Sequence, residues 1–238
     1  MPPCLRPGLV WLAFALGTVL AGPRELIASG RYEEAYREAQ SLGAEGLVWA
    51  ARAANLYATY LAQGDETTLW FTRAEQAATQ ALKLNPRSAE AHFELARAQG
   101  GLLSRRGLLE AAAMVTSMRQ HLEQALQIKP DYAEAKAALA VWHAALAQNG
   151  LGWLYGADAN QANALFEESL KLEDSVVVRV WYALALQQQG KIPEARRQLE
   201  RALAMTPKDA ADRFEQNLAR ERLKSLKGQA TPSSAVLG

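Results

Sequence analysis

Apolar residues recur along this chain with a helical period, and each run of them ends on the same short phrase. The phrase Ala-Leu-x-Leu/Ile-x-Pro occupies residues 81–86 and 125–130, weakens at 169–174, and returns with Met at its fourth position at 202–207. No window sustains the alternation of apolar and polar positions that is typical of a strand. Helices that end on proline at regular intervals are typical of a helical solenoid. The sequence therefore predicts an all-α fold, an α-solenoid of helical hairpins.

The last hairpin shows how such a unit is built. Gly190 can close its first helix, and the proline at 193 suits the first turn of the second. Ala195 and Ala202 are small enough for a neighbouring helix to approach closely, and Leu199 fills the space between them. Pro207 then stops the helix, because proline lacks an N–H and clashes with the preceding turn.

The spacing of the repeats is uneven. Pro86 and Pro130 are 44 residues apart, the same distance separates Pro130 from Asp174, and only 33 residues separate Asp174 from Pro207. Two middle repeats are therefore elongated, each by about ten residues over the usual period of about 34. The extra residues fall between the first and second helix of each hairpin, at 100–114 and 149–160. Stacking of the hairpins is expected to place both inserts on one edge of the solenoid.

Two family resemblances follow from these residues. The Gly, Ala, Leu, Ala and Pro positions of the last hairpin resemble the tetratricopeptide repeat (TPR), and residues 30–35 match the first half of an earlier unit. The elongated middle repeats, with the phrases at 88–96, 121–126 and 141–144, resemble bacterial relatives of the regulator of microtubule dynamics family. The resemblance spans roughly residues 32–207 and implies a TPR-like helical interaction scaffold.

Three further segments complete the expected organisation. The repeat domain covers residues 22–207, and a polar helix at 208–228 is expected to cap the solenoid through a thin apolar stripe. That stripe is predicted to consist of Phe214, Leu218 and Leu226. Residues 229–238 contain Thr, Pro and Ser and are predicted to be a disordered tail.

The N-terminal segment does not belong to the repeats. Arg6 precedes an uncharged apolar stretch at 8–20, and residues 19–21 resemble a cleavage site for a secretory signal peptide. The stretch is shorter than the roughly 20 residues of a membrane-spanning helix. We therefore expect a signal peptide at 1–21, export to the periplasm, and no integral membrane span after cleavage. An uncleaved membrane anchor is the alternative. Cys4 lies within this segment and is the chain's one cysteine.

Composition limits the function classes. Removal of the signal leaves 25 basic and 25 acidic residues, a balance that does not favour nucleic acid as a partner. His92, His121 and His143 are assigned to separate hairpins, where helix packing is their expected role rather than metal binding. No catalytic or phosphate-binding motif is present in the sequence. The prediction is a non-enzymatic protein with no catalytic residues, no cofactor and no metal.

The candidate binding residues form two groups. In the second insert, glycines bracket Trp153 and Tyr155, which either plug a gap between hairpins or anchor a partner; in the first, Arg105 and Arg106 would lie at the rim. The second group lies on the first helices of the hairpins, which line the inner, concave face of a solenoid. Its members are Glu90, Phe93, Arg97, Ala137, Val141, Val180 and Leu184.

These features predict an exported scaffold that binds a protein or peptide partner in the cell envelope. The alternative is a small-molecule-binding accessory component of an envelope transport system, which would require a closed pocket or a pore through the solenoid.

Overall fold

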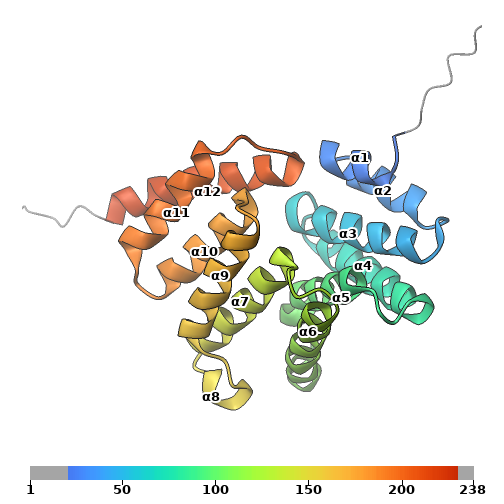
Figure 1. The fold of residues 1–238 in the computed structure, drawn as a ribbon, viewed down its shortest axis with the longest axis horizontal. Helices are drawn as coiled ribbons and strands as arrows, with labels where there is room; N and C mark the ends of the chain where they lie inside the picture. The colour runs from blue at the N-terminus through green and yellow to red at the C-terminus, as the bar shows by residue number, and fades with distance from the viewer. Residues whose placement is uncertain (1–20, 230–238) are drawn as a thin grey trace, which may run out of the picture.

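The computed structural model describes residues 21–229, which form a curved stack of antiparallel helices (Figure 1). Within this range there are helices and turns but no strand, as predicted. A short 3-10 turn, η1 (Leu103–Arg105), separates two of the helices. The α-helices are α1 (Pro23–Ser29), α2 (Tyr32–Ala39), α3 (Gly43–Tyr60), α4 (Asp65–Leu84), α5 (Ala89–Leu102), α6 (Leu108–Ile128), α7 (Ala133–Gln148), α8 (Gly152–Tyr155), α9 (Ala159–Leu172), α10 (Val176–Gln188), α11 (Ile192–Ala204) and α12 (Ala210–Gln229).

The hairpins α3–α4, α5–α6, α7–α9 and α10–α11 are the repeating units. Polar residues define where several of their helices begin. Ser88 accepts a hydrogen bond from the Ala91 N–H at the start of α5, and Ser175 does the same for Val178 at the start of α10. Gly190 ends the last turn after α10 with a φ of +74°, a conformation that glycine adopts without steric cost. The local sequence thus determines where these helices start and stop.

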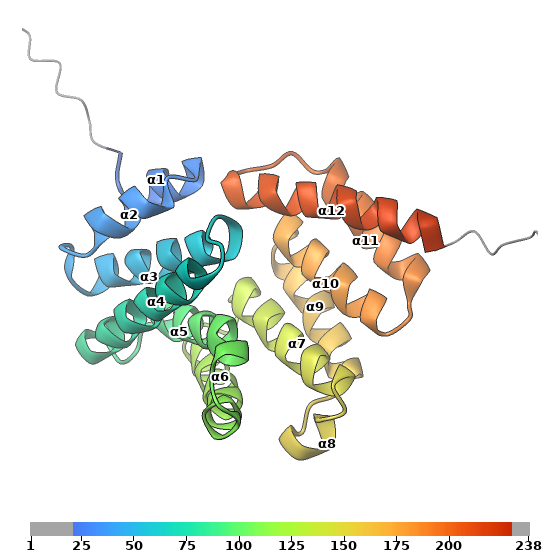
Figure 2. The same ribbon diagram turned by 180° about the vertical axis from the view of Figure 1, so that it is seen from behind.

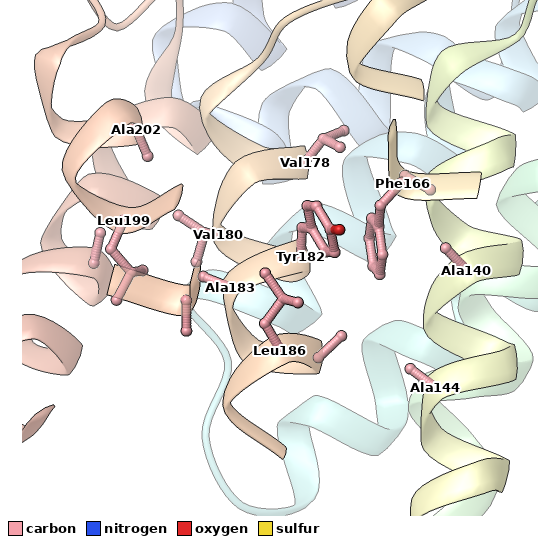
Figure 3. Packing of buried hydrophobic residues seen from close by; sticks show 14 of the residues in the cluster. Ala140, Ala144, Phe166, Val178, Val180, Tyr182, Ala183, Leu186, Leu199 and Ala202 are labelled. Atoms are coloured by element: carbon pink, nitrogen blue, oxygen red, sulfur yellow. The ribbon is translucent and has the colours of Figure 1, made fainter. Parts of the chain in front are cut away.

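The core consists mainly of small side chains packed around a few large ones. In the last hairpin Ala195, Leu199 and Ala202 are all fully buried against α10 and α12. Phe166 of α9 stacks on Tyr182 of α10, with ring centroids 4.9 Å apart, and fills the space between three helices (Figure 3). Close helix contacts through alanine leave little volume to spare, so each large side chain occupies a specific place.

The two inserts have different structures. The first mostly lengthens its hairpin: α5 continues to Leu102, η1 makes the turn, and α6 begins at Leu108. The second leaves the hairpin and forms the short helix α8 between α7 and α9. Helix α6 begins at the outer edge of the molecule, and its last turn leads into α7 at the centre (Figures 1 and 2). Helix α8 lies at the same edge as the start of α6. The two inserts therefore share one edge.

The two ends of the solenoid meet. Helix α12 packs on α10 and α11 and also reaches α1 and α3, so that the end of the first helix meets the start of the last (Figure 2). Tyr60 of α3 stacks on Phe214 of α12 with ring centroids 5.1 Å apart. The Tyr60 hydroxyl also donates a hydrogen bond of 2.8 Å to Glu215 Oε1. The chain thus curves far enough to bring its two ends into contact.

The predicted apolar stripe of α12 is wrong at one position. Leu226 is fully buried and Phe214 is half-buried, but Leu218 is exposed. The neighbouring position that faces α11 is Gln216, whose side-chain amide donates to the carbonyls of Ala202 and Met205 at 2.9 and 2.8 Å. These carbonyls at the end of α11 need donors, so a polar residue occupies the contact face.

The predicted signal peptide lies outside the described residues except for Ala21, and the predicted tail lies outside them except for Gln229, which ends α12. Among residues 21–229, no helix combines the length and the hydropathy needed to span a membrane.

Candidate partner-binding surfaces

The edge that carries both inserts exposes large apolar side chains. Leu108 and Leu109 begin α6 with exposed fractions of 87% and 88%, and Trp153 of α8 is 84% exposed. Leu154, next to Trp153, is also exposed. These four residues are called the insert edge below. Apolar side chains of this size and exposure on neighbouring protrusions are typical of a contact surface.

Trp153 and Tyr155 have different surroundings. Tyr155 is part-buried against the cluster formed by α5, α6 and α7, and its carbonyl accepts a hydrogen bond of 3.1 Å from Arg119 Nη1 of α6. A Cβ on Gly152 would lie 2.5 Å from the Ala157 carbonyl oxygen, so the turn around α8 is tight. Tyr155 therefore plugs the gap between hairpins, which was one of the two interpretations. Trp153 does not plug it and is exposed to solvent.

The two candidate arginines also differ. Arg106 pairs with Glu75 of α4 at 3.7 Å and with Glu110 of α6 at 3.3 Å, so it ties two helices together. Arg105 is exposed at the end of η1. Of the two, Arg105 has the position expected of a rim residue beside the insert edge.

Some candidates for the concave face do lie on it. Val141 is 40% exposed and lines an interior cavity together with Arg97 and Leu184. Val180 and Ala137 are instead fully buried in the core between hairpins. Their assignment to the inner face was wrong, because both pack against neighbouring helices.

The other two candidates are already engaged by neighbouring side chains. Phe93 is 1% exposed and makes a tilted contact with the ring of Tyr132. Glu90 pairs with Lys129 at 3.4 Å, away from the cavity that Val141 lines. Neither side chain is as available to a partner as those of the insert edge.

A buried polar cluster lies beneath this face. The Asn55 amide donates to Glu94 Oε2 at 2.8 Å and to the Glu94 carbonyl at 2.9 Å, and both side chains are almost fully buried. Arg97 Nη1 pairs with Glu94 Oε2 at 3.4 Å. Arg52 lies 3.9 Å from Glu94 Oε1 and also pairs with Glu134. Two arginines and two glutamates thus balance one another, which is what allows a carboxylate to be buried here.

His92 and His121 lie in one hairpin, not in separate hairpins as predicted. Because α5 and α6 run antiparallel, the two Nδ1 atoms are 2.8 Å apart. His92 Nε2 is 3.2 Å from the Pro86 carbonyl oxygen, which can only accept a hydrogen bond, so His92 Nε2 carries a proton. In the neutral pair His92 Nδ1 is therefore the acceptor, and His121 Nδ1–H donates to it. Burial lowers the pKa of both imidazoles.

This pair should make stability depend on pH. A histidine whose folded pKa lies below its unfolded value of about 6.5 binds fewer protons when folded, so stability falls as the pH drops below about 6.5. We expect the free energy of unfolding to decrease between pH 7 and pH 5.5, and His92→Gln/His121→Gln to lose part of that decrease. Each additional proton bound by the unfolded chain lowers the free energy of unfolding by at most about 1.4 kcal/mol per pH unit. Urea denaturation of the wild type and the variant across this pH range measures the decrease. Identical pH profiles for the two proteins would contradict the proposed pair.

The histidines do not make a metal site with acidic neighbours. Within residues 21–229, no three His, Cys, Asp or Glu side chains come together in a way that could hold a metal ion. His143 instead accepts a hydrogen bond at Nδ1 from the Asp158 N–H, at 3.2 Å, and so supports the turn after α8. That the protein has no metal, cofactor or catalytic activity stays a prediction.

Comparison with known proteins places the chain in a family. The family model described as regulator of microtubule dynamics protein 1-3 matches residues 28–227, which is most of the chain. The chain belongs to this family. None of the curated proteins searched matches the sequence of this family member.

Two solved structures resemble this member of the family. The crystal structure of TTC0263, a thermophilic TPR protein from Thermus thermophilus, is 21% identical with a TM-score of 0.64, and the match covers 84% of this chain and 95% of that one. The crystal structure of MamA is 16% identical with a TM-score of 0.43, covering 82% and 92% of the two chains. The first likeness shows the TPR-like fold.

Sequence reasoning missed two features of these surfaces. Leu108 and Leu109 were within the first insert but were not singled out, although two leucines directly after Gly107 at a helix start are a visible signal. The buried Asn55–Glu94 contact joins α3 to α5 across 39 residues. No local pattern marks that pair.

Proposed function

We propose that this protein is an exported, non-enzymatic scaffold of the cell envelope that binds a protein partner through the insert edge. The basic residue and apolar stretch at its N-terminus support export. The observation that carries the binding proposal is the exposure of Leu108, Leu109 and Trp153, each above 80%, on one edge.

Several features make this edge suited to a protein. Trp153 has a large flat side chain held on a short helix whose tight turn limits its movement, and tryptophan is among the residues that contribute most to binding. Leu108 and Leu109 supply apolar area, and Arg105 supplies charge at the rim. The packing of α8 on α7 and the bond from Arg119 of α6 to the Tyr155 carbonyl support a fixed position for α8 before a partner arrives.

We expect Trp153→Ala to weaken partner binding by about 2 kcal/mol or more, roughly thirtyfold, because a central aromatic anchor would be lost. Melting should be unchanged, since the side chain is exposed. The partner is first captured from envelope extract and identified, and its affinity for purified wild-type and variant protein is then measured. Leu84→Ala is the matched control, because Leu84 is 63% exposed at the far end of α4.

Two results would contradict the proposal. Equal affinity of the wild type, Trp153→Ala and Leu109→Ala for the captured partner would exclude the insert edge. Loss of binding in Leu84→Ala alone would place the contact elsewhere. The same preparation tests export, because the intact mass of periplasmic protein should correspond to a chain that begins at Gly22.

A further inference from the structure

The contact between the two ends of the stack contains a buried carboxyl group. Glu215 of α12 is 3% exposed, and its Oε1 accepts hydrogen bonds from the Tyr60 hydroxyl of α3 at 2.8 Å and from Trp181 Nε1 of α10 at 3.4 Å. The ring of Phe214 stacks on that of Tyr60 beside it. These four residues are called the joint below. Among the described residues, the Tyr60–Glu215 bond is the one side-chain hydrogen bond between helices α1–α3 and helices α11–α12.

The second oxygen of this carboxyl group has no partner. Glu215 Oε2 is fully buried, and no donor among the described residues reaches it. A carboxylate that is shielded from water needs donors at both oxygens, and a neutral carboxyl group costs much less to bury than a charged one. Burial accordingly raises the pKa of Glu215, although the bonds from Tyr60 and Trp181 act in the opposite direction. The closed joint therefore favours the protonated side chain.

The other charged groups at the joint oppose one another. Arg97 of α5 lines the same cavity of about 130 Å³ as Tyr60 and Trp181, and its charge favours ionised Glu215. Asp212 lies three residues before Glu215 on α12, and its charge disfavours the ionised form. The remaining titratable side chains of this cavity come from both ends and the middle of the stack and carry mixed charges: Tyr32, Arg52, Glu134, Glu173, Lys208 and Asp209. In the described part of the chain, none of these six forms a hydrogen bond or an ion pair with Glu215.

We propose that Glu215 makes the closure of the stack depend on pH: its protonated side chain holds α3 against α12, and its ionisation lets the joint open. Opening brings water to the carboxylate and so removes the cost of burying its charge. The two equilibria are linked, because a pH that ionises Glu215 favours the open form and opening favours ionisation. Trp181 lines the larger apolar cavity as well as the joint, so opening changes access to the inner side of the stack. This behaviour does not depend on the insert edge.

The direction of the effect follows from proton binding. A glutamate whose pKa in the closed form lies above its ordinary value of about 4.3 binds more protons in the closed form than in the open one. Closure is therefore fully favoured below about pH 4.3, and this contribution is lost as the pH rises through the pKa of the closed form.

The distance between two spin labels on either side of the joint tests the proposal. Gln40, directly after α2, and Ala204, at the end of α11, are both exposed. Cys4 is the chain's one cysteine, so the full chain with Cys4→Ser, Gln40→Cys and Ala204→Cys carries labels at these two positions alone. Double electron–electron resonance measures the distance distribution. We expect the ratio of open to closed molecules to rise at least about threefold between about pH 5 and pH 8, since one proton changes this ratio by up to about tenfold per pH unit.

Substitutions in the labelled protein assign the response to one side chain. Glu215→Gln cannot ionise, so it should remain closed over the whole range and lose the response. Glu221→Gln is the matched control, because Glu221 is an exposed glutamate of the same helix that pairs with Lys224 at 2.8 Å. It should keep the full response. If Glu215→Gln fails to fold, Glu215→Met, which also has no titratable group, decides the result.

Three results would overturn the proposal. The first is a distance distribution that does not change with pH, and the second is a response that persists in Glu215→Gln or Glu215→Met. The third concerns the histidine pair, which titrates in part of the same range. His92→Gln/His121→Gln should keep the response in the labelled protein, and its loss there would assign the response to the histidines instead of Glu215.

Discussion

Phe166→Ala should lower the free energy of unfolding by about 3–5 kcal/mol, as large-to-small changes of a buried aromatic do. Phe166 is fully buried where α7, α9 and α10 meet, and its neighbours Ala140 and Ala144 are too small to fill the space it would leave. Its stacking contact with Tyr182 would also be lost. Urea denaturation followed by circular dichroism measures the change.

Leu172→Ala is the matched control, because Leu172 ends the same helix and is about half exposed. It should cost well under 1 kcal/mol, as surface substitutions usually do. In a solenoid each unit depends mainly on its neighbours, so Phe166→Ala should unfold the C-terminal hairpins first, which hydrogen exchange can resolve. A cost below about 1 kcal/mol for Phe166→Ala would contradict the packing of a fully buried aromatic side chain.

Asn55→Ala should cost about 3 kcal/mol, because a hydrogen bond to a charged group contributes about 1.5–3 kcal/mol and a buried carboxylate left short of donors is costly. Asn55 donates to both the side chain and the main chain of Glu94, and neither residue is exposed enough for water to replace these bonds. Thermal and urea unfolding of the variant measure the loss.

Asn163→Ala provides the comparison. Asn163 also makes two side-chain hydrogen bonds, exchanged with Gln189 at 3.0 and 3.2 Å, but this pair is only part-buried. Water can replace those bonds, so the cost should be about 1 kcal/mol or less. Equal costs for the two variants would mean that burial of Glu94 is not what makes the Asn55 contact important.

Local sequence was enough to predict the repeating units. The signals that define a hairpin act within about one hairpin's length, so the sequence alone was enough to predict their effect. In the last hairpin they are Gly190, the proline at 193, the small residues of α11 and the proline before α12. The elongation of two repeats also followed from spacing alone. Whether an insert lengthens helices, as the first does, or forms a separate helix, as α8 does, depends on packing against α6 and α7 and could not be read from length.

Long-range contacts account for what the sequence did not predict. Tyr60 meets Phe214 and Glu215 only because the whole stack curves until its ends touch, and small rotations added over every hairpin determine that curvature. The histidine pair is different, because the insert at 100–114 lies between the two helices of one hairpin and the sequence was therefore enough to place residues 92 and 121 together. Val180 and Leu218 were assigned to the wrong faces because a one-position shift on a helix turns a side chain by about 100°.

The inner side of the stack bears on the choice between the two predicted functions. A small-molecule role required a closed pocket or a pore, whereas the apolar cavity that Val141 and Leu184 line is partly open to solvent. The outer insert edge is the better place for a protein, because its side chains are exposed without any opening of the stack.

The most direct test of the scaffold proposal is photo-crosslinking in intact cells from a benzoylphenylalanine placed at residue 153. We predict a crosslinked product with a discrete protein, absent when the same probe replaces Leu84, which is also exposed but distant from the inserts. No protein product at residue 153, or the same products from both positions, would contradict a binding role for the insert edge.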